Sequence, residues 1–79
     1  MSYQFTVAGK AFSKTQSDVV SAMKGKDSEN IREHWAEING TRYPVKQVLE
    51  AVTGVDRADF QSMTARRVLR QLGFGVGRG

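Results

Sequence analysis

The sequence predicts one α+β domain, in which a small antiparallel sheet packs against about three short helices. Asn39-Gly40 lies between two β-favouring segments, and this dipeptide is the preferred turn of a two-residue β-hairpin. Apolar residues then recur at helical spacing in the later segments 44–53 and 62–72. A length of 79 residues allows one small domain, which we place at residues 1–79.

The first strand of this sheet is expected at the amino terminus. Residues 3–7 alternate between apolar and polar side chains and favour β-structure. After a turn at 8–10, residues 11–13 can return as a short second strand. Together with the hairpin at 35–43, the amino-terminal strand is expected to build one sheet.

A short helix is expected to follow these strands. Thr15 and Asp18 have the spacing of a capping box, and Gly25 can end the helix in a left-handed conformation. The apolar stripe of this helix consists of Val19, Val20 and Met23. Residues 27–30 are polar and are expected to begin a further helical turn that ends near residue 34.

Two longer helices are expected in the carboxy-terminal half. Pro44 suits the first turn of the first helix, and Ser62 is a suitable N-cap for the second. Gly54 and Gly73 are expected to end them. The two inward stripes are Val45, Val48, Leu49 and Val52, and Ala65, Val68, Leu69 and Leu72. Two helices joined by residues 54–61 are similar to a helix-turn-helix motif. The turn of that motif normally has three to four residues, so this connection is longer.

The segments beside these helices are expected to be a loop and a short edge strand. Residues 55–61 are expected to form a loop or a single turn anchored in the core by Phe60. Residues 74–76 are expected to add an edge strand, and residues 77–79 to fray. Trp35 is expected in the core.

The excess positive charge lies in the carboxy-terminal half. Lys and Arg number 12 and Asp and Glu number 8, which gives a net charge of +4. The first 40 residues are neutral overall, so the rest of the chain holds the whole excess, mainly as arginine. Guanidinium groups form bidentate hydrogen bonds with phosphates and guanine edges. This distribution indicates a nucleic-acid-binding surface, and a solvated charged face is the alternative.

The last helix is expected to carry that surface. When its apolar stripe turns inward, Arg66, Arg67 and Arg70 lie on the exposed side, and no acidic residue occurs from 60 to 72. Like charges on one helix face repel each other, and a polyanion would remove this cost and release counterions. Compensation of the helix dipole explains Arg70 but explains Arg66 and Arg67 less well.

A short motif resembles one found in bacterial DNA-binding modules. The matching residues are Arg42-Tyr43-Pro44-Val45-Lys46-Gln47-Val48, Thr53-Gly54, Phe60, Ala65, Leu69 and Leu72-Gly73-Phe74. The pattern is similar to that of the sulfur-binding domains of type IV restriction endonucleases, which bind phosphorothioate-modified DNA. It also resembles small actinobacterial proteins with Tyr-Pro-Val-Lys-Gln, some of which are associated with DNA containing methylated cytosine.

The resemblance implies that Tyr43 and Pro44 help to line a small apolar surface cavity. The sulfur-binding domains have an alanine three residues after the proline, where this sequence has Gln47. That difference is compatible with another modification, or with a hydrogen bond from Gln47 to a base edge or a phosphate. A 5-methyl group is an apolar target of the kind that the thymine methyl presents.

We therefore predict a DNA-binding protein that recognises modified duplex DNA, with 5-methylcytosine favoured over phosphorothioate, and that performs no catalysis. The expected nucleic-acid contacts are Arg42, Tyr43, Pro44, Lys46, Gln47, Arg57, Arg66, Arg67 and Arg70. No cofactor and no metal are expected. Two copies on one duplex are compatible with so small a surface, and a cytoplasmic, nucleoid-associated location without membrane contact is expected.

Other function classes stay open. An RNA- or ribosome-associated binder fits the basic face, although no aromatic pair that stacks bases is evident. A protein-interaction module with an acidic partner is a further alternative. An enzyme is disfavoured because the sequence has no cysteine and one histidine, His34, which we expect to be incidental. Asp56 and Asp59 could serve a nuclease, but their place in a loop favours a capping role.

Overall fold

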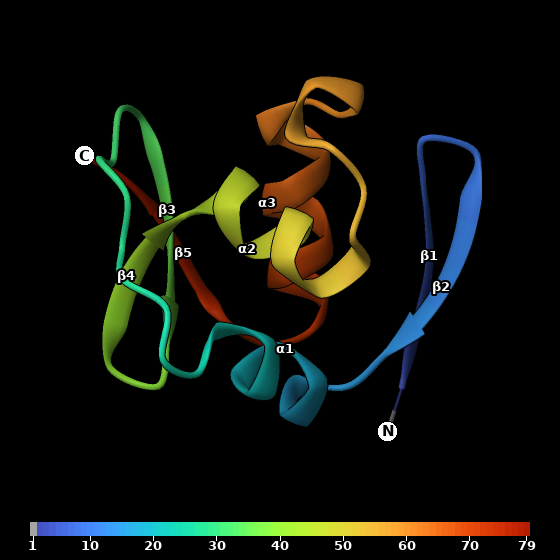
Figure 1. Ribbon diagram of the computed structural model, residues 1–79, viewed down its shortest axis with the longest axis horizontal. Coiled ribbons are helices and arrows are strands. Elements are labelled where there is room, and N and C mark those ends of the chain that lie inside the picture. The colour runs from blue at the N-terminus through green and yellow to red at the C-terminus, as the bar shows by residue number, and fades with distance from the viewer. Residues whose placement is uncertain (1) are drawn as a thin grey trace.

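The amino-terminal strands form a hairpin of their own. The computed structural model describes residues 2–79 and is shown in Figure 1. β1 (Tyr3–Val7) pairs antiparallel with β2 (Lys10–Lys14) across a turn in which Ala8 and Gly9 have φ values of 52° and 77°. Two positive φ values are typical of a type I′ turn, whose twist suits a two-stranded ribbon. The predicted return strand is present and extends one residue further at each end.

One face of this hairpin carries stacked aromatic rings. Phe5 lies opposite Phe12 in the register, and its ring centroid is 5.6 Å from those of both Phe12 and Tyr3. Phe5 and Val7 are buried in the core, whereas Tyr3 and Phe12 are half-buried at its edge. The hairpin is therefore attached to the domain through packing of this face.

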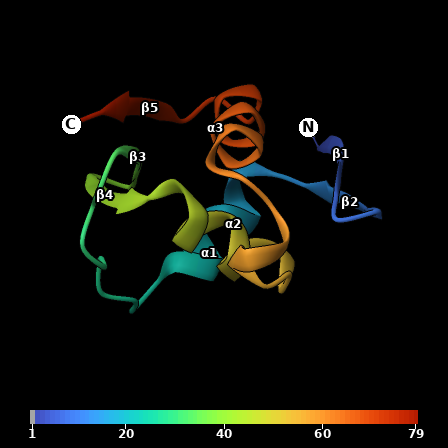
Figure 2. The same cartoon turned by 90° about the horizontal axis from the view of Figure 1, so that it is seen from above.

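The second sheet has the order β4-β3-β5. Its strands are β3 (His34–Ile38), β4 (Thr41–Pro44) and β5 (Gly75–Arg78). Asn39 and Gly40, between β3 and β4, have φ values of 51° and 85°, which confirms the predicted hairpin turn. The prediction that the amino-terminal strand joins this sheet is wrong. Figures 1 and 2 both place α3 between the β1–β2 hairpin and the three-stranded sheet.

The carboxy-terminal strand completes the three-stranded sheet. β5 pairs antiparallel with β3, and Val76 lies opposite Ala36. The predicted terminal edge strand is therefore confirmed. Fraying of residues 77–79 is not observed, because Arg78 pairs with His34 and the Gly79 N–H donates a hydrogen bond of 2.9 Å to the Glu33 carbonyl.

Three α-helices lie in the part of the chain described. α1 (Gln16–Met23) begins at the predicted capping box, in which Thr15 and Asp18 bond each other reciprocally. α2 (Val45–Thr53) follows Pro44 and ends at Gly54 with a φ of 76°. α3 (Ser62–Gln71) begins one residue earlier than predicted, since its N-cap is Gln61. None of these helices is long and apolar enough to cross a membrane.

The connections between helices differ from the prediction in two places. The expected helical turn at 27–30 is wrong, because this segment is an extended loop bound to α2 by side-chain hydrogen bonds. The segment between α2 and α3 holds a short 3₁₀ helix, η1 (Arg57–Asp59), whose N-cap Asp56 accepts a bond of 2.8 Å from the Ala58 N–H. The α2–α3 connection is thus longer than a helix-turn-helix turn.

The core lies where α1, α2 and α3 pack against each other and the inner face of the three-stranded sheet. Both predicted stripes of the longer helices are buried in full, and Phe60 anchors the loop between them as expected. Trp35 is not in the core. It lies on the outer face of the sheet, because side chains alternate along β3 and Ala36 faces inward.

Candidate nucleic-acid interface

The exposed face of α3 carries three arginines, as predicted. Arg67 and Arg70 are exposed, and Arg66 is half-buried. Residues 62, 66 and 70 are spaced four apart, so Ser62 begins a face on which Arg66 and Arg70 follow. Within residues 2–79, no carboxylate oxygen lies within 4.0 Å of these three guanidinium groups. We call Arg66, Arg67 and Arg70 the α3 arginines.

Arg66 has a further unsatisfied group. Its Nε is buried and has no hydrogen-bond partner among the described residues. A buried donor without a partner costs free energy. A new acceptor that bonded Arg66 Nε would remove this cost. The two terminal nitrogens of the same guanidinium, Nη1 and Nη2, would contact a ligand before Nε, because Nε lies nearer to the backbone.

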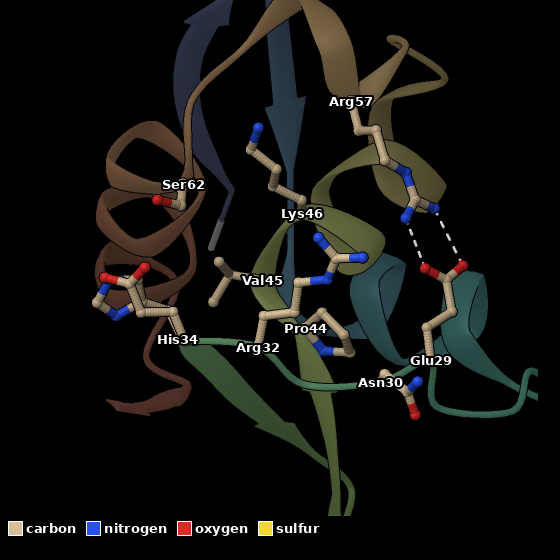
Figure 3. A pocket seen from close by; sticks show the side chains of 10 residues that line it. Glu29, Asn30, Arg32, His34, Pro44, Val45, Lys46, Arg57 and Ser62 are labelled. Atoms are coloured by element: carbon tan, nitrogen blue, oxygen red, sulfur yellow. Dashed lines mark hydrogen bonds and ion pairs between the residues drawn. The ribbon is translucent and has the colours of Figure 1, made fainter. Parts of the chain in front are cut away.

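Arg57 differs from the α3 arginines because its charge is already paired. Its guanidinium donates from Nη2 to Glu50 Oε1 at 2.7 Å. The same nitrogen donates to Glu29 Oε2 at 3.0 Å, and Figure 3 shows Arg57 bonded to Glu29. Hydrogen bonds from Arg57 lower the pKa of both glutamates, and the same bonds raise the pKa of Arg57. Arg57 thus joins the loop to α2, and we no longer assign it a nucleic-acid contact.

Arg42 also has neighbours that the sequence did not indicate. Its guanidinium carbon lies 4.0 Å from the centre of the Trp35 ring, and its Nε is 3.6 Å from Glu37 Oε1. Both neighbours lie on the outer face of the sheet, away from the helices. Arg42 therefore belongs to a different surface from that of the α3 arginines.

Tyr43 and Gln47 are internal, although we predicted them at the DNA surface. Each is only 7% exposed. The Tyr43 hydroxyl donates to the Lys26 carbonyl at 3.3 Å. Gln47 Nε2 donates to the Asp27 carbonyl at 2.9 Å, and its Oε1 accepts from the Glu29 N–H at 3.0 Å. Both side chains hold the loop at residues 24–33, between α1 and β3, which we call the 24–33 loop, and little of either side chain reaches the surface.

A cavity of about 510 Å³ opens between this loop and the starts of α2 and α3 (Figure 3). Figure 3 shows Arg32 and Lys46 at the middle of its opening, with Ser62 and His34 on the α3 side. The lining residues are Glu29, Asn30, Arg32, Glu33, His34, Pro44, Val45, Lys46, Arg57 and Ser62. Pro44, Val45 and Lys46 are thus the motif residues that line this cavity.

Sequence reasoning missed two of the polar residues around this cavity. Arg32 lies in the electrically neutral half of the chain, where total charge gave no reason to select it. Ser62 was interpreted only as a helix cap. No local pattern could place either residue beside Lys46, because the contact depends on how the loop and α3 pack against α2.

The comparisons with known proteins give one match. A family model described as SCO5918-like matches residues 4–78. No curated protein and no solved structure matches the chain. The description of the matching family names no ligand, reaction or partner, so any functional argument rests on the surface described above.

Proposed function

The chain belongs to the SCO5918-like family, and we propose that it binds duplex DNA through the exposed face of α3. The observation that supports this proposal is the difference in pairing among its arginines. Arg42, Arg57 and Arg78 each contact a glutamate, whereas the α3 arginines contact none within residues 2–79. Three unpaired like charges on one helix favour a polyanionic partner.

The placement of α3 suits a helix that contacts a DNA groove. Figure 2 shows α3 above α1 and α2, with no other element covering its upper side. Its ten residues span about 15 Å, and the major groove of B-DNA is about 12 Å wide and admits an α-helix. Arg67 and Arg70 would then contact phosphates or guanine edges, and no chemical step is involved.

A preference for modified DNA is part of the proposal, with 5-methylcytosine favoured over phosphorothioate. Since Tyr43 and Gln47 are internal, Pro44 is the residue of that motif left to supply an apolar contact. It is half-buried and lines the cavity together with Val45. Apolar side chains of this kind contact the thymine methyl in ordinary readout.

The test compares two variants that lose the same charge. In the first, Arg66→Gln, Arg67→Gln and Arg70→Gln are combined. In the control, the exposed lysines Lys10, Lys24 and Lys26 are all changed to Gln. Fluorescence anisotropy then measures the Kd for unmodified, 5-methylcytosine and phosphorothioate duplexes of one sequence over a range of salt concentrations, and sedimentation of the complex gives the number of copies per duplex.

We expect the arginine variant to bind more weakly than the lysine control. The slope of log K against log salt should fall in magnitude by about 0.9 for each phosphate contact removed. Equal losses in both variants would mean that α3 has no special role. Absence of binding to every duplex at low salt would overturn the proposal and favour RNA or an acidic protein partner.

The stacked aromatic cluster of the amino-terminal hairpin does not favour RNA. The aromatic rings of Tyr3, Phe5 and Phe12 stack on each other, and the central Phe5 is buried. Recognition of single-stranded RNA uses ring faces that are free to receive bases. RNA binding is therefore an outcome of the test rather than a second proposal.

A further inference from the structure

The cavity between α2, α3 and the 24–33 loop contains cationic groups that form no ion pair within residues 2–79, although the Lys46 ammonium lies 6.0 Å from the centre of the Phe60 ring. Arg32 extends from the loop, Lys46 from α2 and Ser62 from α3. Within residues 2–79, none of the three side chains forms an ion pair. Two cations and a hydroxyl from separate elements thus line one partly open cavity. The guanidinium and ammonium groups donate hydrogen bonds but accept none, so the matching ligand is an acceptor-rich anion.

The backbone around the cavity adds to this preference. No side chain caps the amino terminus of α2 or α3, and neither helix has an acidic residue in its first turn. Pro44 and Val45 at the start of α2, and Ser62 at the start of α3, all line the cavity. Unbonded N–H groups and the positive ends of both helix dipoles therefore lie beside the unpaired cations.

The acidic residues on the wall do not cancel these cations. Glu29 is held by Arg57 through two hydrogen bonds. Glu33 Oε1 lies 3.4 Å from His34 Nε2 and 3.6 Å from Arg78 Nη2. Each carboxylate thus has a positively charged or protonatable partner of its own, and Arg32 and Lys46 keep their unpaired charge.

Part of the remaining wall is apolar, and the volume suits more than a bare ion. Pro44 and Val45 provide carbon surface beside the cations. A cavity of about 510 Å³ lies within the usual range of about 300–1,000 Å³ for small-molecule sites. A phosphate group, which is anionic and rich in acceptors, fits the polar side, and an attached sugar or base fits the carbon surface.

We infer that this cavity binds the phosphate of a nucleotide, with Arg32, Lys46 and the two helix starts as its anion-binding groups. Two sources share this chemistry, namely a free nucleotide and a phosphodiester of duplex DNA. The second source rests on the proposed function, since Ser62 begins the helix face that continues with Arg66 and Arg70. Lys46, which the sequence analysis predicted as a nucleic-acid contact, would then bind the phosphate from the wall of the cavity.

The test follows backbone amide signals by NMR while 2′-deoxycytidine 5′-monophosphate is added at constant ionic strength. We expect shifts at residues 45–47 and 62–64, and no comparable shifts with 2′-deoxycytidine, which lacks the phosphate. Combining Arg32→Gln with Lys46→Gln should weaken binding at least tenfold. The control removes the same charge by combining Arg42→Gln with Lys10→Gln, two exposed positions outside the cavity, and should change binding less than twofold.

A second arm separates this inference from the proposed function. The triple variant of the α3 arginines should lose duplex binding and keep the nucleotide shifts. If the nucleotide binds and no duplex does, the inference holds for free nucleotides and the proposed function fails. If a duplex shifts the same amides, the phosphodiester is the source. Unchanged amides with both ligands, or equal nucleotide binding by the Arg32/Lys46 variant and the wild type, would overturn the inference.

Discussion

Gln47 and Arg57 show how two residues that the sequence suggests for DNA contacts instead bind other parts of the same chain. Both amide atoms of Gln47 bond the backbone of the 24–33 loop, and Arg57 joins Glu29 of that loop to Glu50 of α2. The loop has no regular secondary structure, so its backbone groups need partners from elsewhere. These two side chains provide partners at the edge of the cavity.

Replacing Gln47 should destabilise the protein. Gln47→Leu keeps an apolar volume in the buried position but leaves the Asp27 carbonyl and the Glu29 N–H unpaired. We expect the free energy of unfolding to fall by about 1–3 kcal/mol. Urea denaturation followed by the fluorescence of Trp35, the single tryptophan, measures this change. Gln71→Leu, at an exposed position of α3, is the control and should change stability by less than about 0.5 kcal/mol.

The Arg57 cluster should make stability depend on acid pH. Hydrogen bonds from Arg57 hold the pKa of Glu29 and of Glu50 below the ordinary glutamate value in the folded state. A lowered folded pKa stabilises the protein above the unfolded pKa of about 4.3, and this contribution is lost as the pH falls through the folded value. The stability difference between wild type and Arg57→Gln should therefore be largest near neutral pH and shrink below about pH 4.

Urea midpoints of both proteins at pH 7 and at pH 3 check this expectation. Taking the difference between them removes titrations that the two proteins share, such as that of Asp18 at the α1 cap, whose pKa is lowered by the Thr15 backbone N–H. A difference that stays constant between the two pH values would show that Arg57 does not act through these carboxylates.

At the scale of elements, β5 depends on a close approach between its backbone and Trp35. Gly77 lies opposite Trp35 in the register, and a Cβ atom built on Gly77 would overlap the indole ring. On the same outer face of the sheet, the Arg42 guanidinium lies 4.0 Å from the centre of the Trp35 ring. A strand rich in glycine thus lets a large ring lie against the sheet.

Gly77→Ala should weaken this packing, while Gly75→Ala should not. The added methyl group must displace the rigid ring, and overpacking of this kind costs about 1–3 kcal/mol. A Cβ at Gly75 meets no atom within 4 Å, so its stability should change by less than about 0.5 kcal/mol. Denaturation measures both changes, and a shifted emission maximum of Trp35 in the Gly77 variant would report the displaced ring. Equal stabilities of the two variants would contradict this account.

At the scale of the whole molecule, two separate sheets share one core through the helices. The β1–β2 hairpin forms no ladder with the other sheet, and its attachment depends on Phe5 and Val7. A two-stranded hairpin alone is marginally stable in water, so the hairpin and the core are expected to unfold together. The domain should therefore show one cooperative transition.

Truncating Phe5 should test this coupling. We expect Phe5→Ala to lower the free energy of unfolding by about 3–5 kcal/mol, and Phe5→Leu to lower it by less. The change should appear in the transition followed by Trp35, which lies in the other sheet. Thr6→Ala, on the exposed face of the same strand, is the control and should leave the midpoint unchanged. An unchanged Trp35 transition in both Phe5 variants would show that the hairpin unfolds independently.

Local patterns were sufficient to predict most elements. The Asn39-Gly40 turn, the capping box at Thr15 and the two apolar stripes of α2 and α3 depend on residues close together in sequence. Their conformations are limited by backbone sterics and by one-sided burial, which act over a few residues. The exposure of Arg67 and Arg70 followed from the same periodicity.

The errors concern contacts between residues far apart in the chain. The separation of the β1–β2 hairpin from the other sheet, the internal positions of Tyr43 and Gln47 and the ion pairs of Arg57 each depend on distant segments. Sequence patterns predict that a polar residue on a short helix is exposed. That prediction is wrong where a loop that needs hydrogen bonds packs against the residue, as at Gln47. The cavity at Arg32, Lys46 and Ser62 arises in the same way, from three segments that only the tertiary structure brings together.

By itself, the sequence determined most of the helices, strands and turns and which face of each longer helix is buried, because periodicity and turn chemistry act locally. Only the tertiary structure decided which cations remain unpaired, because an ion pair depends on distance in space. That difference separates the α3 arginines from Arg57, and it limits the candidate site to the predicted face of α3 and the cavity beside it.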